Sequence, residues 1–266
     1  CGEMRHLAKA YSMQGKEQYR LSFIKGLKYL LSAQYSNGGW PQYFPARTLG
    51  HYSSHITFND GAMVNVLRLM RDISCGLRPF DSLIISDTLI ASVKQAYEKG
   101  VECILNCQIV VDGMPTVWCQ QHDSITLLPA QGRAYELPSF SAHGETPDII
   151  NFLMDIDSPS ERVVRAVDNA IRWLKEHELK DVALEHFVNN EGKPDIRIVH
   201  SEEAKGLWAR FYDLQNAEPL FCDRDGIPQI HIEDIGYERR MGYSWFGNSP
   251  AKVIERYEEW RLRNIF

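Results

Sequence analysis

The chain has 266 residues, of which 44% are hydrophobic and 24% are charged, and its formal net charge at pH 7 is −6. This composition is typical of a folded globular protein, and the acidic balance argues against a nucleic-acid-binding protein, which usually presents a basic face. A local basic cluster for an anionic sugar polymer stays compatible with it. No apolar run approaches the roughly 20 residues that a membrane-spanning helix needs, so we expect no span.

The N-terminus and the cysteines say little about function. The chain starts with Cys1 instead of Met, and residues 1–15 contain no apolar core of a signal peptide, so we expect that something preceded them. Six cysteines are present, and Cys103 and Cys107 would lie one helical turn apart, a poor arrangement for a disulfide. We therefore expect buried free thiols.

A repeat links two stretches of the N-terminal half. "KGLKYLLSAQYSNGGWPQ" starts at Lys25 and "KGVECILNCQIVVDGMPTVWCQQ" starts at Lys99; each has an apolar helical stripe, a Gln, a turn with Gly, and a Trp. Gln34 and Gln108 fall at the same place. A fainter copy, residues 169–179, carries Glu178 instead of Gln. Such units predict helical hairpins in series.

Further helices are expected from "DGAMVNVLRLM", from "SLIISDTLIASVKQAYEKG", after a Ser160 cap, and from the closing "AKVIERYEEWRLRNIF", whereas "DIRIVH" is the best strand signal. We therefore predict a mainly α protein, an (α/α) toroid that forms an incomplete barrel of antiparallel helical hairpins. Its long loops would form a cleft on one face. The alternative is an open α-solenoid. Because no linker divides the chain, we expect a single domain over residues 1–266.

Two acids lie at loop–helix junctions just past the repeat loops. Asp60 heads the helix after "FND" and could be its N-cap or a metal ligand, and Asp123 follows His122. In a ring both would reach the same face and could hold a cation with oxygen ligands. Two carboxylates are too few for a calcium cage, so water and the ligand would complete it. Zinc, prompted by Cys119, is the less favoured alternative.

The other candidates are arginines and aromatics. Arg210 lies among aromatics and acids, and Arg224 lies in an Asp-Arg-Asp-Gly turn that Asp223 or Asp225 could stabilise without any function. An ion pair with Asp213 would explain Arg210 equally well. Trp40, in "NGGWPQYFP", could stack on a sugar or fill the core of its own loop.

These segments together resemble the pectate lyases of polysaccharide lyase family ten. The resemblance rests on "YLLSAQYSNGGWPQYFP", "HITFNDGAMVNVLRLM", "CILNCQIVVDGMPTVWCQQHD", "LLPAQGRAYELPSFS", "LWARFYDLQNAEPLFCDRDGI" and "ERRMGYSWFGNSPAKVIERYEEW", in that order. It implies a toroid and calcium-dependent β-elimination of α-1,4-linked polygalacturonate. It also implies an extracellular, periplasmic or cell-surface location, and we expect a monomer. "AQGRAYE" and "SAHGET" depart from the expected family pattern, and the start looks short, so the N-terminus is expected to be truncated.

The resemblance also implies roles for single residues. Asp60 and Asp123 are the expected calcium ligands, and Arg224 is the expected general base that removes the C5 proton. The residues expected to bind substrate are Arg210, Arg133, Trp40, Asn59 and His122.

Other functions stay open at this stage. One is an inverting glycoside hydrolase on the same toroid, which would use two acids such as Asp60 and Asp123. A second is a non-catalytic pectin-binding module that keeps the aromatics and arginines. A third, weaker one is a zinc-dependent prenyl-transferring ring, prompted by the Gln-to-Gly-Gly-Trp repeat.

Overall fold

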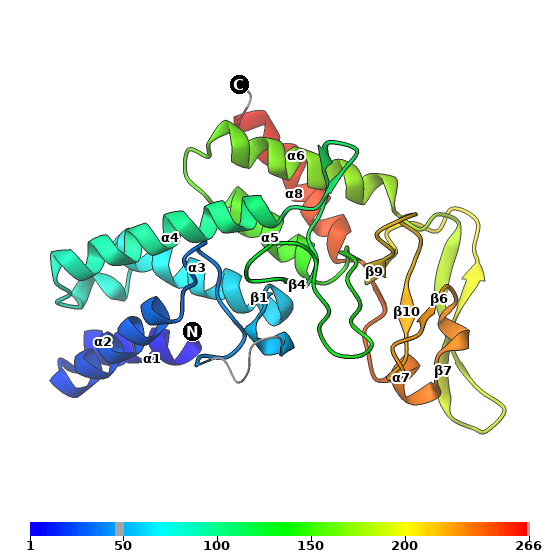
Figure 1. Cartoon of the computed structure of the whole chain (residues 1–266), viewed down its shortest axis with the longest axis horizontal. Coiled ribbons are helices and arrows are strands. Elements are labelled where there is room, and N and C mark those ends of the chain that lie inside the picture. Colours follow the sequence, from blue (N-terminus) through cyan, green and yellow to red (C-terminus); the bar gives the residue numbers. More distant parts are fainter. Residues whose placement is uncertain (46–50, 265–266) are drawn as a thin grey trace. The chain divides into compact units, whose positions relative to one another are not determined.

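The structure is a computed structural model that describes residues 1–45 and 51–264. The chain forms two compact units, whose elements are labelled in Figure 1. The first unit comprises Cys1–Asn106 and Ser124–Leu127, and the second comprises Cys107–Asp123 and Leu128–Phe266. That residues 1–266 form a single functional domain stays a prediction.

The prediction of a mainly α, (α/α) toroid is wrong. Helix accounts for about 47% of the residues and strand for about 15%, and the described chain shows no clear toroid of helical hairpins. Most of residues 178–247 consists of strands and loops, where the sequence suggested only one short strand. Many of these strands are two residues long, which is too short for an apolar alternation to register in the sequence.

The first unit is helical. Helices α1 (Gly2–Gln14) and α2 (Glu17–Ser32) pack as a hairpin through a left-handed Gly15, and α3 (Ala62–Ser74) and α4 (Asp87–Cys107) follow after the short strand β1 (Ile56–Thr57). Its core is apolar, with fully buried side chains from four helices: Ala8, Phe23, Leu27, Leu67, Met70 and Val93.

The second unit combines helices with short antiparallel strand pairs. Helix α6 (Glu161–Glu176) contacts both α5 (Glu145–Met154) and α8 (Ser249–Arg263). The predicted cap of α6 is confirmed, because the Ser160 hydroxyl accepts the Val163 N–H. The last two residues of the predicted closing helix, 265–266, lie outside the described residues. The strands and the small helix are β2 (Val110–Val111), β3 (Met114–Pro115), β4 (Gln121–His122), β5 (Phe140–Ser141), β6 (Val182–Val188), β7 (Pro194–His200), β8 (Trp208–Ala209), β9 (Phe211–Tyr212), β10 (Phe221–Cys222), β11 (Pro228–Gln229), α7 (Tyr237–Met241) and β12 (Phe246–Gly247).

The side chains of the sequence repeat have equivalent roles. Gln34 Nε2 donates to the Gly38 carbonyl in its own loop (2.9 Å) and to a carbonyl of α4 (2.8 Å). Gln108 Nε2 donates to the Thr116 carbonyl (2.8 Å) and to a carbonyl of α6 (2.9 Å). Glu178, in the third copy, instead accepts a backbone N–H of its loop (2.6 Å). The repeat is therefore confirmed as a recurring helix–loop closure.

Two tryptophans, Trp40 of the first copy and Trp208 downstream of the third, close helix–loop units in the same way. Trp40 Nε1 donates to the Leu30 carbonyl and Trp208 Nε1 donates to the Leu174 carbonyl, both at 2.8 Å. Each carbonyl belongs to the last turn of a helix, where backbone acceptors lack a partner within the helix. The repeated Trp therefore caps the helix that precedes its loop.

Replacing Gln108 with Leu should destabilise the protein by about 2 kcal/mol, because two buried carbonyls lose a donor. Gln34→Leu should cost less, because Gln34 is only half-buried, and the exposed control Gln215→Leu should change stability by less than about 0.5 kcal/mol. Urea unfolding followed by circular dichroism measures all three. Equal stabilities of Gln108→Leu and Gln215→Leu would contradict this role.

The β6–β7 hairpin is anchored through Asp195. The Arg240 guanidinium donates to both of its carboxylate oxygens (2.7 and 2.9 Å), and this bond lowers the pKa of Asp195. A carboxyl with a depressed pKa stabilises the fold above its ordinary pKa of about 4 and loses that contribution as the pH falls further. Asp195→Asn should therefore cost about 3 kcal/mol at pH 7. The difference from wild type should shrink in unfolding experiments below about pH 4; a constant difference from pH 7 to 3 would refute the assignment.

Candidate active site

Three guanidinium groups surround the ring of Tyr135 in the second unit. The guanidinium carbons of Arg133, Arg224 and Arg239 lie 5.6, 5.8 and 4.3 Å from the ring centroid, which is within cation–π range. Arg133 and Tyr135 belong to the loop between β4 and β5, Arg224 to the turn after β10, and Arg239 to α7. Three separate segments therefore meet at one buried aromatic ring.

A second ring extends this cluster to Arg210. Tyr243 packs edge-on against Tyr135 at a centroid distance of 5.2 Å, and the guanidinium carbons of Arg210 and Arg239 lie 4.8 and 5.4 Å from its centroid. We call Arg133, Arg210, Arg224 and Arg239, with these two tyrosines, the arginine cluster. It brings together all three arginines that the sequence suggested.

The sequence reasoning missed Arg239 and both tyrosines. The stretch "ERRMGYSW" was recognisable as rich in arginine and aromatic residues, but nothing in it distinguishes Arg239 from the adjacent Arg240. Arg240 forms an ion pair with Asp195, whereas the Arg239 guanidinium lies over the Tyr135 ring. Tyr135 was within the quoted "GRAYE" motif, two residues after Arg133, and its central position follows only from the fold.

Glu136 contacts the arginine cluster from the protein interior. It is completely buried; its carboxylate accepts the Arg133 backbone N–H (2.9 Å) and the Tyr243 hydroxyl (3.1 Å), and lies 3.3 Å from Arg133 Nε. Burial is the largest influence and lowers the pKa of Arg133, but Glu136, Tyr135 and Tyr243 together outweigh it, so that the pKa is raised overall. Arg133 is therefore a cation in the free protein.

Arg210 is fixed by a buried ion pair. Its Nη2 lies 2.8 Å from Glu145, whose side chain is 3% exposed and also hydrogen-bonds the Ser141 hydroxyl. Burial, followed by the charge of Arg210, lowers the pKa of neighbouring His143 to about 4. His143 is hence neutral at pH 7 and hydrogen-bonds the hydroxyls of Ser249 and Ser244.

Arg224 is the exposed member of the cluster. Its Nε and Nη2 each donate to Glu238 at 3.0 Å, and this bidentate bond raises the pKa of Arg224. As expected, the adjacent acids face the backbone: Asp223 accepts the Arg224 N–H (2.7 Å) and Asp225 accepts the Ile227 N–H (2.9 Å). The turn therefore exposes the Arg224 side chain. Its Nε and Nη2 are nevertheless engaged by Glu238, a residue that the sequence analysis did not consider.

Asn59 and Asp60 lie in the first unit, in a single 3₁₀ turn before α3. Asp60 is exposed with φ 54°, and α3 begins after Gly61 with no side-chain cap on its first turn in the described chain. Asn59 is buried, and its Nδ2 has no hydrogen-bond partner among the described residues. The proposed cap role of Asp60 is thus not observed, which leaves its carboxylate available to a ligand.

His122 and Asp123 belong to the second unit and are held by their loop. His122 is completely buried, and its Nε2 accepts the Cys119 N–H (3.1 Å), so direct contact with a substrate is not supported. Asp123 is partly exposed and its N–H donates to the Leu128 carbonyl (2.8 Å). Because Asp60 and Asp123 belong to different units, their meeting stays a prediction.

Trp40 does not offer a face to a sugar. Its side chain is 3% exposed and its indole N–H is used by α2, so it fills the core of its loop. Of the aromatics in this loop, Tyr43 is the exposed one, at 49%.

The chemistry of the donors fits calcium better than zinc. Within the described ranges no group of three or more His, Cys, Asp or Glu side chains could hold a metal ion, and all six cysteines are free thiols. Asp60 and Asp123 offer hard carboxylate oxygens, which calcium prefers, and further ligands would have to come from water or substrate.

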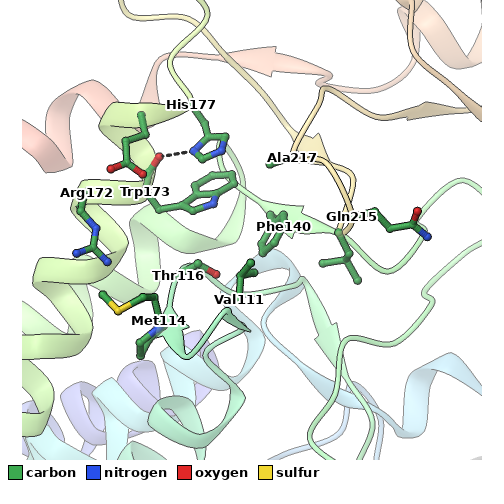
Figure 2. A pocket seen from close by; sticks show the side chains of 12 residues that line it. Val111, Met114, Thr116, Phe140, Arg172, Trp173, His177, Gln215 and Ala217 are labelled. Atoms are coloured by element: carbon green, nitrogen blue, oxygen red, sulfur yellow. Dashed lines mark hydrogen bonds between the residues drawn. The ribbon is translucent and has the colours of Figure 1, made fainter.

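A cavity of about 510 Å³ in the second unit is lined by none of the predicted site residues. It lies between the β2–β3 hairpin, the end of α6 and the loop after β9 (Figure 2). His177 stacks on Trp173 there at 4.0 Å, above Phe140. A smaller cavity of about 290 Å³ is lined by Tyr243 and Arg240 and so adjoins the arginine cluster.

Among the described residues, none of the helices combines the length and the hydrophobicity that a membrane span requires.

Comparison with known proteins identifies the family. The family model for pectic acid lyase matches residues 1–254. A solved family 10 polysaccharide lyase from Cellvibrio cellulosa is 33% identical, with a TM-score of 0.85 over 96% of this chain and 77% of that one. A mutant of such a lyase from the same organism, in complex with trigalacturonic acid, is also 33% identical, with a TM-score of 0.84 over 95% of this chain and 77% of that one. No curated protein matches the chain.

The family match over nearly the whole length, together with these two lyase structures, shows that this chain belongs to the pectic acid lyase family and is a pectate lyase, an enzyme of the polysaccharide lyase class.

Proposed function

We propose that this enzyme cleaves polygalacturonate by β-elimination at the arginine cluster. The observation that carries the proposal is the convergence of Arg133, Arg210 and Arg224 on two tyrosine rings, because arginine forks match carboxylates and the substrate carries one on every sugar. The complex of a related lyase with trigalacturonic acid supports the same substrate class.

Elimination requires a base at the C5 proton of galacturonate and expulsion of the C4 oxygen. The negative charge that develops next to the sugar carboxylate must be stabilised by preorganised cations. Arg210, locked by Glu145 and flanked by the neutral His143, supplies a fixed positive charge for that purpose. We assign it to the binding of a substrate carboxylate.

We further propose that the enzyme requires Ca²⁺, held by Asp60 and Asp123. Bound to the substrate carboxylate, the ion would act as a Lewis acid that stabilises developing negative charge. The exposed Asp60 carboxylate, which caps no helix, supports this assignment. A monomeric state and a location outside the cytoplasm are expected from the family resemblance and stay predictions.

Arg224 is the proposed general base, and its ion pair sets a condition. A base must be neutral when it takes the proton, but Glu238 raises the pKa of Arg224. We therefore propose that Glu238 releases Arg224 when substrate binds. Arg133 is the second candidate base; burial lowers its pKa, but Glu136 and the two tyrosines together raise that pKa above its ordinary value, so Arg133 too would have to lose these contacts before it accepts a proton.

Elimination makes a C4=C5 double bond conjugated to the carboxylate, which absorbs ultraviolet light, whereas hydrolysis does not. We expect the enzyme to raise ultraviolet absorbance on polygalacturonate, to lose this activity with a calcium chelator, and to regain it with Ca²⁺ but not Zn²⁺. New reducing ends without absorbance would favour an inverting hydrolase. Binding without product would favour a pectin-binding module, and full activity in chelator would refute the calcium assignment.

Arg224→Lys should lower kcat by about 10²–10⁴-fold, the usual range for loss of a general base, with a smaller change in KM. Arg210→Lys should raise KM and also lower kcat, because Arg210 is proposed both to bind a substrate carboxylate and to stabilise the charge that develops. Arg256→Lys, on α8, is the control that should leave both unchanged. The dependence of kcat/KM on pH, measured from pH 6 to 11 for the wild type and for Glu238→Gln, tests the role of Glu238. Because Glu238 raises the pKa of Arg224, its removal should shift the acidic limb of the profile to lower pH.

Adding Arg133→Lys to this set of variants separates the two candidate bases. Should Arg224→Lys keep full activity while Arg133→Lys loses it, the base is Arg133 and the assignment of Arg224 fails. A flat profile for the wild type from pH 5 to 10 would refute an arginine base altogether.

A further inference from the structure

We propose that Tyr135 is the positioning residue of the active site, and that its ring holds Arg133, Arg224 and Arg239 in one place for the reaction. The inference rests on the proposed function of the arginine cluster and adds a residue that does not itself touch substrate. Tyr135 is 4% exposed, so it acts through its neighbours.

The three guanidinium groups come from separate segments and have different anchors. Arg133 is held by Glu136 and Arg224 by Glu238, whereas Arg239 Nη2 donates to the Gly242 carbonyl (3.0 Å). The Tyr135 ring is the group that all three approach within 6 Å.

Arg239 shows most directly what the ring contributes. Its side chain is 6% exposed, its Nε has no hydrogen-bond partner among the described residues, and Glu238 lies 3.6 Å away while engaged with Arg224. A buried cation with incomplete hydrogen bonding needs another source of stabilisation. The face of Tyr135, 4.3 Å from the guanidinium carbon, is such a source.

The ring also resists the mutual repulsion of the cluster. Its quadrupole attracts each cation while the cations repel one another, so their spacing depends on the ring at the centre. The Tyr135 hydroxyl accepts a hydrogen bond from Arg133 Nη1 (2.8 Å), and the edge contact with Tyr243 extends the arrangement to Arg210. All four arginines therefore depend on the position of one side chain.

The electrostatic role of the ring can be tested without changing its shape. Tyr135→Phe provides a baseline that lacks the hydroxyl, and site-specific incorporation of mono-, di- and trifluorophenylalanine at position 135 then weakens the quadrupole stepwise. We expect kcat/KM on polygalacturonate to fall about twofold per fluorine and about tenfold over the series. The melting temperature should stay constant, and Tyr135→Leu should lose at least as much activity as the trifluoro form.

The matched control is the same series at Tyr257 on α8, whose ring faces Lys175 at 5.8 Å instead of the arginine cluster. Its kcat/KM should stay constant. A flat series at Tyr135, or a loss of activity that follows the melting temperature, would overturn the proposal.

Alanine variants of the arginines separate this inference from the proposed function. Full activity of both Arg133→Ala and Arg224→Ala would remove the arginine site itself, and the role of Tyr135 with it. Inactive arginine variants with a flat fluorination series would overturn the role of Tyr135 alone.

Discussion

The constraint on which the site depends is the crowding of four guanidinium groups around two tyrosine rings. Cations so close together repel one another, and the repulsion is strong where water is excluded. The protein offsets it with two buried acids, Glu136 and Glu145, with Glu238 at the surface, and with the faces of the rings. What remains is a set of preorganised guanidinium groups, of which Arg133 and Arg224 are the more exposed members.

The internal repeat explains how the loops of each unit are fixed well enough to carry such side chains. In both clear copies a glutamine bonds its own loop and the second α-helix after it, and the indole N–H groups of Trp40 and Trp208 each cap the preceding helix. The Gln of the two clear copies recurs at the same place after its helix, so the sequence could reveal the repeat, whereas the spacing to the bonded partners differs, with 10 and 34 residues for the two tryptophans. The corollary is that Trp40 belongs to the scaffold and not to the sugar-binding surface.

The limits of the sequence interpretation follow from the same physics. The Asp223 and Asp225 turn was predictable because its hydrogen bonds are local. The toroid was not excluded in advance because two-residue strands leave no periodicity. The burial of His122, and the central place of Tyr135, depend on packing between distant segments. The family resemblance located the arginines; only the structure showed that Glu238 holds one of them.

The loops that begin at Trp118 and Trp208 share one backbone design, and this bears on the proposed metal ligand. Asp123 and Asp213 each donate their N–H to the carbonyl of the residue five positions later. In both loops the residue four positions after the Asp, Leu127 or Ala217, has a positive φ. In the second loop the Asp213 carboxylate is spent on its own turn, where one oxygen accepts two backbone N–H groups. A carboxylate has two oxygens, so the matching Asp123 can stabilise its turn with one and hold a cation with the other. In the calcium site proposed above, Asp123 would thus be a ligand whose position is set by the loop design.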